Sequence, residues 1–375
     1  MRRASLGTAA LCAFAASLAA QQRASQETVR PIEPPAIALP SEQDSAGVTK
    51  FAFLAYGDTR GQVNGQELQP DHARVIDGML EAMKSEAAAG FPVRFVVQSG
   101  DAVTSGGAVE QWNLRFTSLI ERLTREAVVP FFFAVGNHDT GGSPAGASSE
   151  WERLRNAAAA MSKLWPREGS RRRLDGYATF AFGFGQFFFI ALDSNIGTDD
   201  TQRAWVTSQL EGLDRRRYPH VVAFFHHPPI TSGTHGGATV VEPQSVAMRN
   251  LYLPLFRRHH VRMTIAGHDH LLDHWVEHYE DQTGVHRMDQ VVSGGGGAPQ
   301  YVYRGEPDLK RYVAEAAPQR VRIEHLVKPS PEASENPHHF LIFEVDGDRL
   351  WIQAVGTGAT PFLPYGHPRI ELSDR

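Results

Sequence analysis

Five short apolar runs constrain the fold of this chain more than any other feature, because each ends abruptly in small and polar residues. They are FAFLAY (51–56), VRFVVQ (93–98), VVPFFFAV (128–135), HVVAFF (220–225) and VRMTIA (261–266). Such runs are typical of fully buried strands. Amphipathic segments separate the first three, with core-facing residues at Val75, Met79, Met83, Trp112, Phe116, Leu119 and Leu123. The alternation predicts βαβ units and a largely parallel sheet.

The remaining segments predict further strands with antiparallel character. Residues 176–182 and 186–193 are close enough to form a hairpin, and residues 338–356 form a second hairpin with Asp-Gly-Asp as its turn. Further helices are expected over residues 148–165, 202–216 and 245–260. The segment 301–337 is polar and contains prolines, which predicts an excursion from the core.

The N-terminus has the pattern of a secretory signal peptide. Arg2 and Arg3 precede a short apolar stretch that ends in small residues near Ala20. We expect residues 1–20 to be removed, a periplasmic or secreted location, and no membrane span afterwards; an uncleaved anchor is the alternative. Residues 21–49 are rich in Pro, Gln, Ser and Glu, which predicts a disordered linker before a domain over residues 50–375.

Charge and cysteine content narrow the chemistry. The formal net charge of −5 lacks the basic excess that is typical of nucleic-acid-binding proteins, so no nucleic acid partner is expected. Cys12 is the only cysteine, and it lies inside the predicted signal peptide. Any metal in the mature protein would therefore be held by His, Asp, Glu or Asn.

The polar residues that end the apolar runs are of the kinds that bind metals. They are Asp58, Asp101, Asn137, His138, His226, His227, His268 and His270. Ligands of open α/β sheets bind at the carboxyl ends of strands, so these side chains are expected to converge on one crevice. Imidazole, carboxylate and amide oxygen together suit Zn, Mn or Fe. A carboxylate that bridges two such ions would give a centre for in-line displacement at phosphorus.

The ordered motifs GD (57–58), GD (100–101), GNHD (136–139), a histidine after the fourth run and GHDH (267–270) resemble the calcineurin-like metallophosphoesterase superfamily over roughly residues 50–300. The segments HHPPITSGTHGG, GHDHLLDHW and VVSGGGG are similar to its purple acid phosphatase branch, particularly the small tartrate-resistant members. The resemblance implies an α/β four-layer sandwich of two mixed β-sheets flanked by helices. It also implies a dinuclear metal centre and hydrolysis of phosphate esters by a metal-bound hydroxide.

The family pattern assigns roles residue by residue. It implies that Asp58 and His270 bind the first metal and that Asp101 bridges both. The second metal would be completed by Asn137, His226 and His268. Three further residues would act around the substrate: His138 on the phosphate or the leaving oxygen, Asp139 as the partner that orients His138, and His235 from its loop. His227 is expected to pack or to support the ligands.

Two positions depart from the family pattern. Many members carry a metal-binding histidine two places after the first aspartate, where this chain has Arg60. Purple acid phosphatases carry a tyrosine three places after the bridging aspartate, where this chain has Thr104. The first metal therefore lacks one expected protein ligand.

The residues leave three functions open. The first is an exported phosphohydrolase that prefers small phosphomonoesters. The second is a phosphodiesterase acting on nucleotides or lipid headgroups, because the same metals serve both reactions. The third is a non-catalytic envelope protein that retains the fold as a binding module, which the incomplete first metal site would favour.

Overall fold

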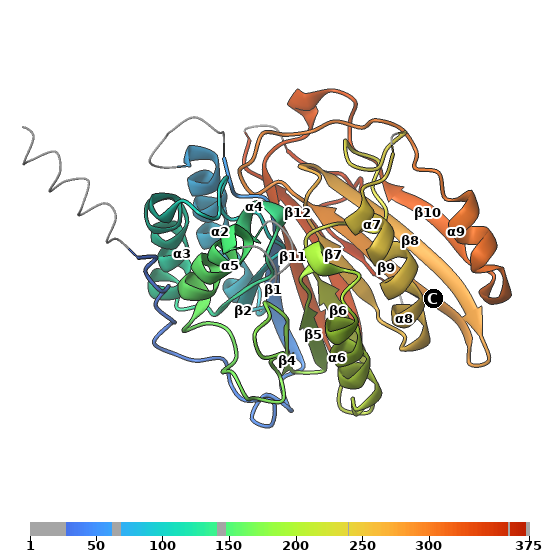
Figure 1. The fold of residues 1–375 in the computed structure, drawn as a ribbon, viewed down its shortest axis with the longest axis horizontal. Coiled ribbons are helices and arrows are strands. Elements are labelled where there is room, and N and C mark those ends of the chain that lie inside the picture. The colour runs from blue at the N-terminus through green and yellow to red at the C-terminus, as the bar shows by residue number, and fades with distance from the viewer. Residues whose placement is uncertain (1–27, 62–68, 141–147, 239, 359–360, 373–375) are drawn as a thin grey trace, which may run out of the picture.

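A computed structural model of the chain describes residues 28–61, 69–140, 148–238, 240–358 and 361–372. The predicted signal peptide lies outside these residues. Two mixed β-sheets pack face to face, with helices covering both outer faces (Figure 1). This is the four-layer α/β arrangement that the sequence predicted, and that prediction is confirmed.

The first sheet has the strand order β13-β12-β11-β1-β2-β3. Its strands are, in that order, Ile370–Glu371, Arg349–Gly356, His339–Asp346, Lys50–Tyr56, Val93–Gln98 and Phe131–Phe133. β1, β2 and β3 are parallel, whereas β11 is antiparallel to β1. The predicted C-terminal hairpin is present as β11 and β12, with Asp346 opposite Arg349.

The second sheet has the strand order β10-β8-β9-β7-β6-β5-β4. Its strands are, in that order, Arg322–Val327, Leu272–Asp281, Gly284–Ser293, Met263–Ala266, His220–Phe224, Phe187–Ala191 and Phe180–Phe184. β5, β6, β7 and β9 run parallel, and β4 and β8 are antiparallel to their neighbours. The expected hairpin near residue 185 is therefore present as β4 and β5.

Helices lie in two groups on the outer faces (Figure 1). Over the first sheet lie α2 (Pro70–Ala88), π-helical Gln111–Thr117, α3 (Ser118–Glu121), π-helical Arg122–Glu126 and α5 (Ser148–Met161). Over the second lie α6 (Asp200–Glu211), α7 (Pro243–Ala247), π-helical Met248–Tyr252, α8 (Leu253–Arg258) and α9 (Lys310–Glu315). The short helices are α4 (Asn137–Thr140), Ser194–Ile196, Ala317–Gln319 and Ala333–Glu335.

Phenylalanine rings from both sheets form the central core. Phe53 of β1 meets Phe189 of β5 edge to face, with ring centroids 5.2 Å apart. Phe95 of β2 packs against the same ring at 5.1 Å, and Phe132 stacks on Phe182 at 3.8 Å. Edge-to-face and offset contacts between large rings add about 0.5–1.5 kcal/mol per pair beyond simple burial. This core fixes the two sheets together beneath the strand ends.

Two segments differ from the sequence-based expectation. Residues 28–49 were expected to be a disordered linker, but Val29 and Ile32 are buried and the Ile32 amide donates to the Ala160 carbonyl. The excursion predicted over 301–337 is interrupted by strand β10, which pairs with β8 and so belongs to the second sheet. In both cases a few apolar residues within a polar segment pack against the domain.

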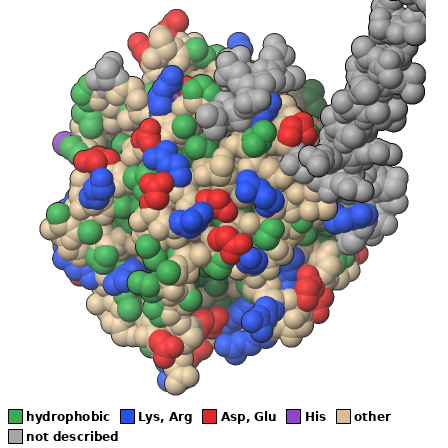
Figure 2. All heavy atoms as spheres, turned by 90° about the vertical axis from the view of Figure 1, so that its left-hand side faces the viewer, with side chains coloured by type: hydrophobic (Ala, Val, Ile, Leu, Met, Phe, Trp, Pro, Cys, Tyr) green, Lys and Arg blue, Asp and Glu red, His purple; other side chains and the backbone are tan. Residues whose placement is uncertain are grey.

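The outer surface over α2 and α3 carries acidic and basic side chains interspersed on the face drawn in Figure 2. Among the residues that the structure describes, no helix is long and apolar enough to cross a bilayer.

Buried His220 makes the stability of the fold sensitive to acid. Burial, together with the Arg262 and Arg215 guanidinium groups, lowers the pKa of His220 to about 3. The unfolded chain takes up this proton near pH 6.5, so the free energy of unfolding falls as the pH drops from 6.5 toward 3. Between pH 7 and pH 5 this effect lowers the free energy of unfolding by roughly 2 kcal/mol, and we expect His220→Gln to abolish that part of the decrease. Denaturant unfolding across this range measures the slope, with exposed His367→Gln as the control; equal slopes in all three proteins would contradict the prediction.

Candidate metal centre

The carboxyl ends of β1, β2, β3, β6 and β7 meet at one edge of the two sheets. Their connecting loops are tied by backbone hydrogen bonds: the Asp58 amide donates to the Gly100 carbonyl at 3.0 Å, and the Gly267 amide donates to the His226 carbonyl at 3.0 Å. All six predicted metal ligands lie in these loops. The structure therefore brings together side chains that are more than 200 residues apart in the chain.

Three of the predicted ligands have left-handed backbone conformations. Asp58, Asp101 and His268 have φ angles of 60°, 57° and 72°. Such conformations cost about 1–3 kcal/mol each and persist only where the surroundings enforce them. Here the hydrogen bond from the His268 amide to Asp58 Oδ2, at 2.9 Å, helps to hold two of the three. The strain turns each side chain from the strand direction into the crevice.

The glycines in these motifs allow the loops to approach one another. A Cβ on Gly136 would lie 2.2 Å from Asp101 Oδ1, and a Cβ on Gly267 would lie 2.3 Å from Asp58 Oδ2. Any larger residue would therefore push a carboxylate out of place. This close packing explains why a glycine precedes Asn137 and another precedes His268.

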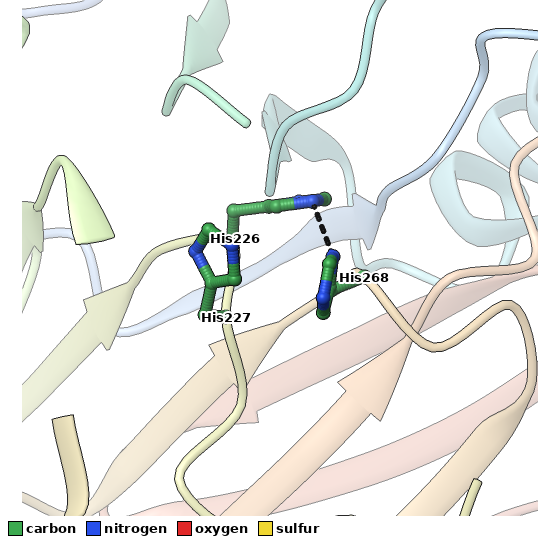
Figure 3. A group of neighbouring side chains, drawn as sticks. All are labelled: His226, His227 and His268. Carbon is green, nitrogen blue, oxygen red and sulfur yellow. Dashed lines mark hydrogen bonds between the residues drawn. The ribbon is translucent and has the colours of Figure 1, made fainter. Parts of the chain in front are cut away.

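One group of donor atoms surrounds the Nε2 atom of His226. Asn137 Oδ1 lies 2.9 Å away, His268 Nδ1 lies 3.1 Å away and Asp101 Oδ1 lies 3.3 Å away. Figure 3 shows a hydrogen bond joining the His226 and His268 rings, with His227 beside them. This group contains the ligands that the sequence assigned to the second metal.

The outward nitrogens of the histidines fix where their protons lie. His226 Nδ1 donates to the Ser99 carbonyl at 3.0 Å, His270 Nδ1 donates to the Pro299 carbonyl at 2.7 Å, and His268 Nε2 donates to the Glu242 carboxylate at 2.8 Å. A carbonyl or carboxylate oxygen can only accept, so these outward nitrogens carry protons, and the inward nitrogens are the ones that could bind a metal once they are deprotonated. Metal-binding histidines are oriented in this way in proteins.

Four potential ligand atoms therefore lie together around the second site. Burial alone would lower the pKa of His226, but the Asp101 and Asp58 carboxylates raise it to about 9. The surroundings thus favour a positive charge at this point. The donor set of two imidazoles, one amide oxygen and one carboxylate fits Zn, Mn or Fe.

A second group of donors contains Asp58 and His270. His270 Nε2 is 3.4 Å from Asp58 Oδ1. This Asp58 oxygen is buried and accepts no hydrogen bond among the described residues. An unsatisfied buried carboxylate oxygen facing an imidazole lone pair also fits a cation. One ligand atom each from Asp58, Asp101 and His226 lies within 4.8 Å of the other two, so the two groups adjoin at Asp101.

Arg60 occupies part of the first site. Its Nε lies 3.4 Å from Asp101 Oδ2, and its Nη2 lies 3.5 Å from His270 Nε2. The Thr104 hydroxyl donates to the Arg60 carbonyl at 2.8 Å, and Gln69 Nε2 donates to the same carbonyl. The two positions that depart from the family pattern are thus in direct contact. Their combined effect is to set a guanidinium beside the ligands of the first metal.

The predicted role of Asp139 is wrong in the structure. His138 Nδ1 donates instead to the Thr104 carbonyl at 2.8 Å, which leaves its Nε2 4.0 Å from Asp101 Oδ2. The Asp139 carboxylate accepts the backbone amides of Gly136, Asp101, Ala102 and Val103. Asp139 therefore holds the metal-binding loops together and does not orient the His138 ring.

Glu242 is a member of this site that the sequence did not indicate. Its two oxygens accept from His268 Nε2 at 2.8 Å and from His235 Nδ1 at 2.6 Å. The His235 ring stacks on the His268 ring with centroids 3.9 Å apart. Glu242 follows a loop and precedes α7, where an isolated glutamate before a proline carries no recognisable signal. The expected action of His235 on the substrate stays a prediction.

His227 does not belong to the ligand set in the same way. Its Nδ1 lies 2.8 Å from the Ser194 hydroxyl, which also accepts the His227 amide at 2.9 Å. The ring packs 4.4 Å from that of His268. His227 thus supports a ligand from behind, as the sequence suggested.

Two mixed sheets with carboxylate, amide and imidazole donors at their strand ends define a metal-dependent phosphoesterase architecture. The family model for calcineurin-like phosphoesterases matches residues 53–272, and the chain belongs to this family. The family predicted from the motifs is thereby confirmed, and with it the class of phosphoric ester hydrolases. Members of this class use a dinuclear metal site, and the donor groups described above are its candidates.

Two solved structures are similar to this chain, and the first of them shares its fold. The purple acid phosphatase PPD1 from yellow lupin (Lupinus luteus) seeds has a TM-score of 0.61 and 16% identity, and the match covers 88% of this chain and 54% of that one. The chain thus spans about half the length of the lupin protein. GAP50, the anchor in the inner membrane complex of Plasmodium, has a TM-score of 0.48 and 15% identity over 87% of this chain and 90% of its own. A search of curated proteins found no match.

Removal of the bridging carboxylate tests the centre. We expect Asp101→Ala to lose both metals and to lower phosphoesterase activity by more than roughly 100-fold, because each site loses a charged ligand. Metal analysis by mass spectrometry after dialysis measures the ions per chain, with exposed Asp348→Ala as the control. An Asp101→Ala protein that retains two ions per chain would show that the bridge is misassigned.

Proposed function

We propose that this protein is an exported, metal-dependent hydrolase of small phosphate esters that prefers monoesters. The observation that carries the proposal is the convergence of Asn137 Oδ1, His268 Nδ1 and Asp101 Oδ1 on the Nε2 atom of His226. The proposal of export rests on the signal-like residues 1–20, which lie outside the described structure.

The ions would be Fe, Mn or Zn, held by the two donor groups that adjoin at Asp101. When bound, such ions polarise phosphoryl oxygens and lower the pKa of a water molecule, so that it ionises near neutral pH. The protein's own contribution is to fix the ligands before any substrate arrives. The backbone bonds of Asp139 and the outward hydrogen bonds of the histidines supply this rigidity.

His138 is the side chain best placed to act on the substrate. Its Nδ1 is committed to the Thr104 carbonyl, and about a third of the side chain remains exposed, at 32%. A substrate beside Asp101 would meet the Nε2 atom of this ring. We assign to His138 a hydrogen bond to the phosphate or the protonation of the leaving oxygen.

Positive charge around the crevice supports a preference for monoesters. Arg60 lies at one side of the centre, with its side chain 13% exposed. On the other side, burial opposes the charged form of His235, but the hydrogen bond to Glu242 raises the pKa of this histidine. A monoester carries up to two negative charges on its phosphate and a diester carries one. Two cationic groups therefore favour the monoester.

The choice of substrate can be tested with two aryl phosphates. We expect the metal-loaded protein to hydrolyse p-nitrophenyl phosphate with a kcat/KM at least about tenfold higher than that for bis(p-nitrophenyl) phosphate, a difference of roughly 1.4 kcal/mol in transition-state stabilisation. A reversed ratio would favour the diesterase. No hydrolysis of either compound by fully loaded protein would favour the binding module.

Substitution of His138 separates catalysis from metal binding. We expect His138→Ala to keep its metal content and to lose about 10²–10⁴-fold in turnover on esters with poor leaving groups, because general acid help matters most there. Turnover across a series of aryl phosphates measures the effect. Loss of metal from His138→Ala would show that this residue is a ligand.

Arg60 should make the two metal sites unequal. The guanidinium repels an ion in the first site, which also lacks a histidine at position 60 and a tyrosine at position 104. We expect a colourless protein in which the second site fills first and added Mn²⁺ activates after mild chelation. Stepwise calorimetric titration should show tighter binding at the first site in Arg60→His.

Arg60→Gln is the matched control, because it removes the charge without adding a strong ligand. An intermediate affinity in this variant would separate charge repulsion from ligand number. A purple protein, or two equally tight sites that Arg60→His leaves unchanged, would contradict the prediction.

A further inference from the structure

A second cluster of potential metal ligands lies far from the candidate centre. His260 follows helix α8, Asp281 ends strand β8 and His286 lies in strand β9. The hairpin of β8 and β9 extends to the lower right in Figure 1, beside α8. β8 begins just after His270 and runs for 10 residues away from it, which is roughly 30 Å of extended strand. This cluster is therefore separate from the chemistry proposed above.

The three side chains converge closely. His260 Nε2 lies 2.8 Å from Asp281 Oδ2, and His286 Nε2 lies 2.9 Å from Asp281 Oδ1. The two imidazole rings stack with centroids 4.1 Å apart and an angle of 20° between their planes. One ligand atom from each residue lies within 4.8 Å of the other two. Both rings thus present the same nitrogen to one carboxylate.

The surrounding residues hold these groups in place. The Thr283 amide donates to Asp281 Oδ1 at 2.7 Å, and the Thr283 hydroxyl donates to the same oxygen at 2.6 Å. Bonds from Thr283 and then from His260 hold the pKa of Asp281 well below its usual range, so the carboxylate stays ionised. The Tyr279 ring packs against His286 at 5.2 Å. The Asp281 carboxylate and the His286 ring are therefore held in place without an ion.

His260 is held in an unusual backbone conformation. Its φ angle is 48°, in the left-handed region, and the Arg215 guanidinium donates to its carbonyl at 3.2 Å. Histidine tolerates this region better than most residues, but the conformation still has a cost. It directs the ring from the end of α8 onto the hairpin. The cluster thereby joins a helix end to the tip of the β8–β9 hairpin.

We propose that His260, Asp281 and His286 form a third metal site that binds one divalent ion of the zinc class. Two imidazoles and a carboxylate are a ligand set that suits Zn²⁺, with water able to complete a tetrahedral coordination. The side chains are 36%, 28% and 21% exposed in the order His260, Asp281, His286, so an ion can reach them from solvent. Bound there, the ion fastens the hairpin tip to the end of α8.

Calorimetric titration with Zn²⁺ tests the site directly. The full-length protein, its catalytic centre loaded beforehand with Mn²⁺, is compared with Asp281→Asn and His286→Gln. Asparagine keeps an oxygen that accepts from Thr283 and loses the charge, so the hairpin should remain folded. Beyond any exchange of Zn²⁺ for Mn²⁺ at the catalytic centre, we expect one further binding event in the wild-type protein that either substitution weakens at least about tenfold, with the variants matching wild-type aryl phosphatase activity. His278→Gln, on the same strand, is the control.

An anomalous difference map from crystals soaked in Zn²⁺ locates the ion. Density between the two rings and Asp281 supports the proposal. Titrations that are the same in wild-type protein and in both variants, or a zinc peak only at the catalytic centre, overturn it. The result does not depend on the proposed hydrolase activity, because the readout is binding at residues remote from the catalytic centre.

Discussion

Asp101 makes the contact on which both halves of the candidate centre depend. One of its oxygens faces His226 and the other faces Arg60, and the backbone at this residue is left-handed. Two buried carboxylates and several imidazole lone pairs cannot be gathered without a compensating positive charge. Arg60 and His226 supply part of that charge beside Asp101, and metal ions bound in the crevice would supply more.

The fold and most of the site were predictable from local patterns. Apolar runs that end in Gly-Asp or Gly-Asn-His-Asp indicate both a buried strand and the residue type at its end. For that reason Asp58, Asp101 and His268 were expected at strand ends, and they lie together in the structure; their assignment as metal ligands came from the family resemblance. The strand order was not encoded in this way, because it depends on contacts between distant segments.

The features that were missed share a physical cause. Strands β8 and β9 contain many charged residues, so they lack the apolar signature of the other strands. Their charges are neutralised inside the fold: His274 pairs with Asp289 at 2.8 Å, and Glu277 pairs with Arg257 at 2.8 Å. Glu242 was missed because its role comes only from contact with His235 and His268. Contacts between side chains that are distant in the sequence produce no periodic pattern in the sequence.

The bonds of Asp139 have a consequence for the way this protein handles different metals. Four backbone amides from two loops converge on this one buried carboxylate, so the ligand-bearing loops are fixed by the protein itself. Exchange of one ion for another then requires side-chain adjustments but no rearrangement of the main chain. Because the loops are already folded, the choice between ions depends on their charge and preferred coordination, and the energy of folding contributes little to it.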